Sequence, residues 1–170
     1  IERGNVRPPA LGPAIGERAG QLYVHMEVVD RTPVFRSPDH LRLDSSDHVR
    51  VSYIRPDGDD GRIAIVFGAP GVITAYEMTA DWRYAQTGTP NTQLQGVMEE
   101  TSDGLRIEFR MPLAQIGSSR YFGLAYADVA DPAAREIRRI TQTLPTAGKE
   151  SFNLVVLRSP EVLNIIRGLG

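Results

Sequence analysis

The sequence lacks cysteine, contains a single tryptophan and has no long apolar run. Without cysteine, the chain can form no disulfide framework, no thiolate metal site and no cysteine nucleophile. No stretch approaches the roughly 20 apolar residues that a membrane-spanning helix requires. The formal net charge is -2, with Lys149 as the one lysine among 19 basic residues, so the chain as a whole does not attract nucleic acid electrostatically.

The length of 170 residues fits one domain, which would bury roughly 70% of its unfolded surface on folding. Residues 1–20 contain four glycines and three prolines and show neither a helical nor an alternating period, which predicts an extended lead-in. We expect the folded domain to occupy residues 21–158. A short helix that leads to another module or to a membrane should occupy residues 159–170.

The segment Gly104–Gly117, GLRIEFRMPLAQIG, carries the clearest structural pattern. Its apolar and charged residues alternate, with Leu105, Ile107, Phe109 and Met111 on one face and Arg106, Glu108 and Arg110 on the other. This period of two predicts a strand with one buried face. Pro112 cannot donate to a sheet, so the strand should end there and pass into a short helical turn over Leu113–Ile116.

Further alternating or apolar runs predict strands at Leu22–Val29, Asp47–Arg55, Arg62–Phe67, Val72–Met78, Gln93–Glu99, Tyr121–Val129, Ile137–Leu144 and Phe152–Leu157. The Asp- and Gly-rich turn at residues 56–61 should join two of them as an antiparallel hairpin. Ser159, Pro160 and Glu161 form a helix start, and apolar residues recur at helical spacing as far as Leu169. Together these elements predict an all-β fold, a two-sheet antiparallel sandwich with a short C-terminal helix.

Three motifs of known catalytic chemistry are absent from the sequence: it contains no G-x-S-x-G, no phosphate loop and no H-E-x-x-H. The acidic loop at residues 57–61 lacks the glutamate that an EF-hand needs at its twelfth position, where Gly68 stands. Glu77, Glu99 or Glu108 could form an acid–base couple with Asp128. The alternative is cross-strand ion pairing with Arg106 and Arg110, so we expect no enzyme activity in this segment.

Two groups of residues are candidates for a site. An aromatic and polar loop can stack a sugar or hold a small polar ligand through Trp82, Arg83, Tyr84, Gln86 and Asn91. Alternatively, Trp82 closes one end of the sandwich. A second loop contains the weaker metal candidates His40, Asp44, Asp47 and His48, whose spacing matches no established ligand pattern. We therefore predict neither a metal nor a cofactor.

Four segments, read in order, resemble the family 9 type carbohydrate-binding modules and related DOMON-like sandwiches. They are LYVHMEVVDRTPV, DHVRVSYIRPDG, GLRIEFRMPLAQIG and YFGLAYADVAD, within residues 21–131. The resemblance implies a two-sheet antiparallel sandwich in which Glu108, Pro112 and Asp128 are structural. The family binds sugars and, in some relatives, haem. Its sugar-binding members typically stack the sugar between paired tryptophans, whereas Trp82 has no second tryptophan.

The C-terminal segment ESFNLVVLRSPEVLNIIRGLG resembles the region after such a sandwich in extracytoplasmic sensor domains of proteobacterial histidine kinases associated with a dedicated sortase system. This resemblance implies a periplasmic, non-catalytic sensor domain of a membrane-anchored protein-histidine kinase. A homodimer, as in receptor kinases, is a further expectation. The ligand would be a small molecule, a glycan or a protein, and not nucleic acid.

Two other functions compete with the sensor hypothesis. The first is a carbohydrate-binding module of a secreted polysaccharide-degrading enzyme. The second is haem-binding electron transfer, which would need axial ligands from His25, His40, His48 or a methionine, and these show no telling arrangement.

Overall fold

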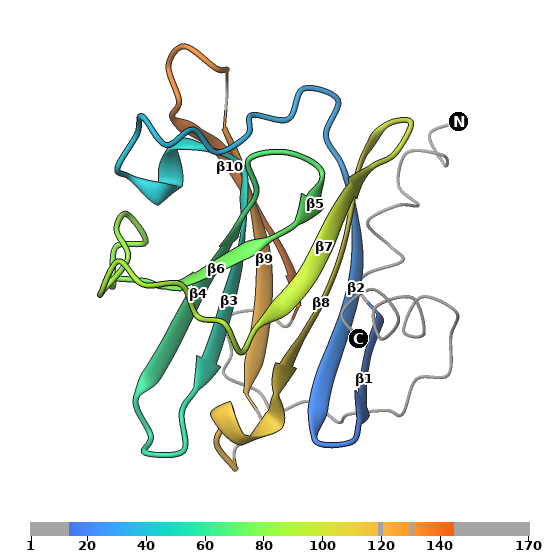
Figure 1. Cartoon of the computed structure of the whole chain (residues 1–170), viewed down its shortest axis with the longest axis vertical. Coiled ribbons are helices and arrows are strands. Elements are labelled where there is room, and N and C mark those ends of the chain that lie inside the picture. The colour runs from blue at the N-terminus through green and yellow to red at the C-terminus, as the bar shows by residue number, and fades with distance from the viewer. Residues whose placement is uncertain (1–13, 119–120, 130, 145–170) are drawn as a thin grey trace.

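Two antiparallel sheets of five strands each pack against one another in the computed structural model, which describes residues 14–118, 121–129 and 131–144 (Figure 1). Sheet A has the order β1 (Ala14–Arg18), β2 (Gln21–Val29), β8 (Gly104–Pro112), β7 (Gln95–Glu100) and β5 (Gly71–Val72). Sheet B has the order β10 (Ile137–Leu144), β9 (Phe122–Val129), β3 (His48–Ile54), β4 (Asp60–Val66) and β6 (Thr74–Glu77). The predicted all-β sandwich is confirmed.

Strand β8 occupies the centre of sheet A. It pairs with β2 along its whole length, from Gln21 opposite Pro112 to Val29 opposite Gly104, and with β7 on its other side. The four apolar residues of its predicted inner face, Leu105, Ile107, Phe109 and Met111, are all fully buried. The period of two in the sequence therefore identified the core-facing side of β8 correctly.

Both sheets bury one apolar face in the same core. Sheet A contributes Leu22, Val24 and the inner face of β8, and sheet B contributes Val49, Val51, Ile63, Ile65 and Leu124. Each fully buried side chain of this kind contributes roughly 1.5 to 3 kcal/mol of transfer free energy. Neither sheet can expose its inner face without losing many such contributions, so the two sheets depend on each other.

Strand β1 was not predicted from the sequence. Residues 14–18 pair with β2 across a two-residue turn in which Ala19 and Gly20 both have positive φ, at 53° and 78°. Positive φ at both central residues is the geometry that suits a tight hairpin. The sequence predicted an extended lead-in over residues 1–20, and residues 14–18 are extended but pair with β2 as a strand of sheet A. No alternating pattern marks this strand in the sequence, because it is short and Ile15 is its one large apolar residue. Residues 1–13 of the lead-in lie outside the described residues.

The predicted strand Val72–Met78 is divided between the two sheets. β5 pairs with β7 in sheet A, whereas β6 pairs with β4 in sheet B. Ile73 lies between them, buried in the common core, and its N–H donates to the carbonyl of Gly96 at 3.1 Å. The chain thus crosses from one sheet to the other at this residue.

Helical structure in the described ranges is limited to two short 3-10 turns, η1 (Leu43–Ser45) and η2 (Leu113–Gln115). The second lies where a turn was predicted after Pro112. In the same ranges, no helix is long and apolar enough to cross a membrane. The predicted strand Phe152–Leu157 and the predicted C-terminal helix lie outside the described residues.

Replacing Phe109 by alanine should lower the free energy of unfolding by about 3 to 5 kcal/mol, because it opens a cavity in the shared core. Arg110→Ser on the opposite face of β8 should change it by less than about 0.5 kcal/mol, since the hydrogen bonds of that side chain within the described ranges go to exposed Gln95. Urea unfolding of both variants measures the difference. Equal losses would contradict the assignment of the two faces.

Candidate functional site

The loop between β6 and β7 forms a polar hollow on one side of the sandwich. Its backbone is held against β6, since the N–H of Gln86 donates to the Glu77 carbonyl at 2.8 Å and that of Asn91 to the Ala75 carbonyl at 2.7 Å. Leu94 then anchors the end of the loop in the core. These contacts give the exposed loop a defined course between the two sheets.

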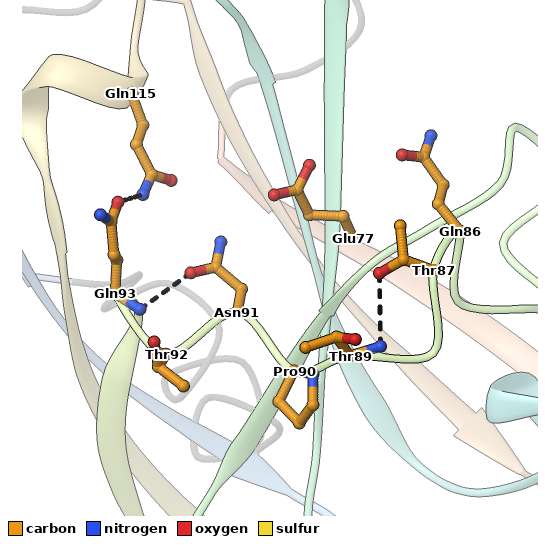
Figure 2. Close-up of a pocket in the computed structure, with 9 residues that line it drawn as sticks. All are labelled: Glu77, Gln86, Thr87, Thr89, Pro90, Asn91, Thr92, Gln93 and Gln115. Carbon is orange, nitrogen blue, oxygen red and sulfur yellow. Dashed lines mark hydrogen bonds between the residues drawn. The ribbon is translucent and has the colours of Figure 1, made fainter.

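The hollow has a volume of about 310 Å³ and a lining of amide, hydroxyl and carboxylate groups (Figure 2). The amides belong to Gln86, Asn91, Gln93 and Gln115, and the carboxylate to Glu77. Three threonines, Thr87, Thr89 and Thr92, and Pro90 complete the lining. None of the described residues that line it is aromatic, so these residues would hold a ligand by hydrogen bonds and not by stacking.

Hydrogen bonds between lining residues orient several of these groups. The N–H of Gln93 donates to Asn91 Oδ1 at 2.9 Å, and Gln115 Nε2 donates to Gln93 Oε1 (Figure 2). Glu77 accepts from the Arg55 guanidinium at 2.9 Å, which keeps a cation beside its carboxylate. Gln115 reaches the hollow from η2, at the end of β8, while Glu77 belongs to β6. The hollow therefore joins residues of both sheets.

The structure separates the predicted aromatic patch. Gln86 and Asn91 line the hollow, but Trp82 does not. The Trp82 ring is half-buried against Ala64 and Met78, and the Arg50 guanidinium lies 5.0 Å from its centroid. Because the neighbours of Ala64 in β4 point into the main core, this small cluster covers the outer face of sheet B.

The other two residues of the predicted patch lie elsewhere. Tyr84 is 46% exposed and does not line the hollow. Arg83 lines a second hollow of about 750 Å³, together with His40 and Asp44. Asp44 is held there by both Nε and a terminal nitrogen of Arg42, at 2.9 and 2.7 Å, so its charge is already paired.

The metal candidates of the sequence do not converge. His40 and Asp44 face the second hollow, whereas Asp47 and His48 are fully buried. Asp47 instead lies beside two carboxylates from other parts of the chain. In the described residues, one set of three acidic side chains is close enough to share a metal ion. We call this set the carboxylate cluster: Asp30, Asp47 and Asp128.

The carboxylate cluster is buried and tied to the backbone. Asp47 accepts from the N–H of Val34 at 2.8 Å with one oxygen and from that of Val129 at 2.7 Å with the other. Asp30 Oδ2 accepts from the Tyr126 hydroxyl at 2.8 Å. A guanidinium nitrogen of Arg138 donates to Asp128 Oδ2 at 2.7 Å.

Burial raises the pKa of Asp47 to about 7, and the neighbouring Asp30 carboxylate adds to the shift. Burial and the same two acids raise the pKa of Tyr126, so its hydroxyl remains a hydrogen-bond donor at neutral pH. Sequence reasoning considered Asp47 and Asp128 only in separate groups. Asp30, Asp47 and Asp128 come from distant parts of the chain, so no local spacing could have signalled the cluster.

The members of the candidate acid–base couple do not lie at one place in the described structure. Glu99 and Glu27 pair with Arg106, and Glu108 lies 3.0 Å from His25 Nδ1 across β2 and β8, while Asp128 belongs to the carboxylate cluster. The alternative of cross-strand ion pairing is thus confirmed for Arg106. Arg110 differs, because it hydrogen-bonds to Gln95 instead of an acid.

Comparison with known proteins found no matching family model, no matching curated protein and no matching solved structure. The geometry of the polar hollow and the sequence resemblance are therefore the basis of the functional proposal.

His48 gives a prediction about pH. Its Nδ1–H donates to the Ser46 carbonyl at 2.8 Å, and its Nε2 accepts from Arg50 Nε at 3.0 Å. Burial lowers its pKa from 6.5 to about 4. The unfolded chain therefore binds a proton at His48 more readily than the folded chain does. The contribution of neutral His48 to the free energy of unfolding is fully present above about pH 6.5 and should be lost as the pH falls towards 4. The loss is up to about 3 kcal/mol.

Denaturant unfolding between pH 7 and pH 4 tests this, with His48→Gln as the non-titrating comparison. The wild-type protein should lose more stability over this range than the variant does. Identical pH dependence in the two proteins would contradict the assignment of a neutral, buried imidazole.

Proposed function

We propose that this chain is a non-catalytic, extracytoplasmic ligand-sensing domain of a membrane-bound sensor histidine kinase, and that the polar hollow binds its ligand. The observation that carries the binding role is the gathering of four side-chain amides, three threonines and a carboxylate in one hollow. The receptor role rests on the resemblance of the C-terminal segment to sensor domains of such kinases.

The lining of the hollow favours a small ligand rich in hydroxyl or amide groups. An amide side chain offers both donors and an acceptor, and a threonine hydroxyl offers one donor and two lone pairs. Such groups complement the hydroxyls and N-acetyl groups of a sugar. Glu77 adds a hydrogen-bond acceptor. Its negative charge would repel the electron-rich oxygens of a ligand, and the guanidinium of Arg55, which donates to Glu77, reduces that repulsion. We therefore expect the hollow to bind a neutral glycan fragment more tightly than an acidic one.

Ligand binding can be coupled to signalling because the hollow spans the two sheets. Gln115 follows β8 of sheet A, and Glu77 ends β6 of sheet B. A ligand that hydrogen-bonds to both Gln115 and Glu77 favours the arrangement of the two sheets in which these side chains are close enough to bind it together. A kinase can be biased only by such a difference in affinity between two states of its sensor.

The same lining also supports the second candidate, a carbohydrate-binding module of a secreted polysaccharide-degrading enzyme. The two functions share the binding chemistry and differ in what the domain is joined to. The genomic sequence on either side of the chain separates them. Membrane spans and a kinase core support the sensor, and a glycoside hydrolase supports the module.

Thermal unfolding with neutral oligosaccharides, uronic-acid oligomers and short peptides tests the hollow, because a ligand of the native state raises the melting temperature. A neutral sugar should raise it. Gln86→Ala and Gln93→Ala should each weaken binding about fivefold in calorimetric titration, as expected for one lost hydrogen bond. The matched control is Gln95→Ala, an exposed glutamine on β7 outside the hollow.

Two outcomes would contradict this site. One is a panel in which no compound shifts the unfolding transition. The other is a sugar whose binding survives both hollow variants but is lost in Trp82→Ala, which would move recognition to the outer face of sheet B. For the receptor role, the same sugar should change the autophosphorylation rate of the membrane-embedded parent kinase, and the same change in Gln93→Ala should need about fivefold more sugar.

A further inference from the structure

We propose that the carboxylate cluster is a binding site for one Ca²⁺ ion. Asp30, Asp47 and Asp128 are 6%, 0% and 7% exposed, and one oxygen from each lies within 4.8 Å of the others. This proposal is independent of the polar hollow and of the function proposed for it.

The carboxylates of the cluster outnumber the cations that the described residues place beside them, and either a shared proton or a bound metal ion can balance the excess. Among the residues that the structure describes, one guanidinium pairs with the three carboxylates, that of Arg138, and the Arg138 side chain is 55% exposed. A buried carboxylate is costly unless it is paired or coordinates a metal. Hydrogen bonds from Val34, Val129 and Tyr126 stabilise individual oxygens but bring no formal positive charge.

A second observation points to a ligand at this place. Asp128 uses Oδ2 to accept from Arg138, but its Oδ1 is buried and has no hydrogen-bond partner in the described part of the chain. Buried polar atoms of folded proteins are almost always satisfied. An unsatisfied carboxylate oxygen in a group of three converging acids is available as a metal ligand.

The donor set favours a hard cation. The cluster offers only carboxylate oxygens, without histidine, which excludes the nitrogen and sulfur ligands preferred by zinc or copper. Calcium binds oxygens at about 2.3 to 2.6 Å, so two of its ligands on opposite sides lie about 5 Å apart. The observed separations fit within that span. Each oxygen that already accepts one hydrogen bond retains a lone pair for the ion.

The ion would connect the two sheets at the end of the sandwich opposite η2 (Figure 1). Asp30 directly follows β2 of sheet A, Asp47 directly precedes β3 of sheet B, and Asp128 belongs to β9 of sheet B. We expect an affinity in the range of extracellular calcium modules, with a dissociation constant on the order of 0.1 to 1 mM.

Calorimetric titration and thermal unfolding of the chain at pH 7.5, after dialysis against a chelator, test the proposal. Ca²⁺ at 10 mM should bind one ion per chain and raise the melting temperature by on the order of 5 °C. Terbium is a useful second probe, because Tyr126 donates to Asp30 and is placed to sensitise luminescence of an ion in the cluster. Terbium emission should appear on tyrosine excitation and fall when Ca²⁺ is added.

The informative variant is Asp128→Asn, which removes one ligand charge while Asp47 keeps its two backbone hydrogen bonds. It should weaken Ca²⁺ binding at least tenfold. The matched control is Asp44→Asn, whose carboxylate pairs with Arg42 away from the cluster, and it should bind as the wild type does. Absence of one-to-one binding by the wild type, equal binding by Asp128→Asn, or binding of Mg²⁺ as tight as that of Ca²⁺ would each overturn the assignment.

Discussion

The burial of one apolar face of each sheet against the other is the constraint on which this structure depends. Strand β8 shows it most directly, since its four inner apolar side chains are fully buried while Arg106 and Arg110 stay on the outer face. A shift of one residue in the pairing with β2 would place these arginines in the core. The register of sheet A is therefore set by burial, and the positions of the loops follow from it.

Both candidate sites are places where the chain passes between the sheets or joins their ends. The polar hollow forms where the loop after β6 returns to β7, and it includes Gln115 from the turn after β8. The carboxylate cluster joins the end of β2 with the beginning of β3 and with β9. A rigid core thus holds polar groups of distant sequence position within a few ångströms of one another.

The polar residues at the start of β3 are connected to one another and to Trp82 by hydrogen bonds and a cation–π contact. Asp47 accepts from backbone on both sides, and the adjacent His48 links the Ser46 carbonyl to Arg50. Arg50 in turn lies over the Trp82 ring on the outer face of sheet B. Trp82 is therefore explained by packing and by a cation–π contact, which contributes roughly 0.5 to 2 kcal/mol. The described residues that line the polar hollow include no aromatic ring.

The sequence by itself determined the all-β class, the inner faces of β2 and β8 and the hairpin of β3 and β4, because alternation and turn residues are local properties. It did not reveal β1, whose pattern is too short, or the passage of Ile73 from one sheet to the other. Only the tertiary structure brought Gln86 and Asn91 together with Gln115, separated them from Trp82, and assembled Asp30 with Asp47 and Asp128. These groupings depend on which strands become neighbours, and that choice is made by burial of the shared core rather than by any spacing along the chain.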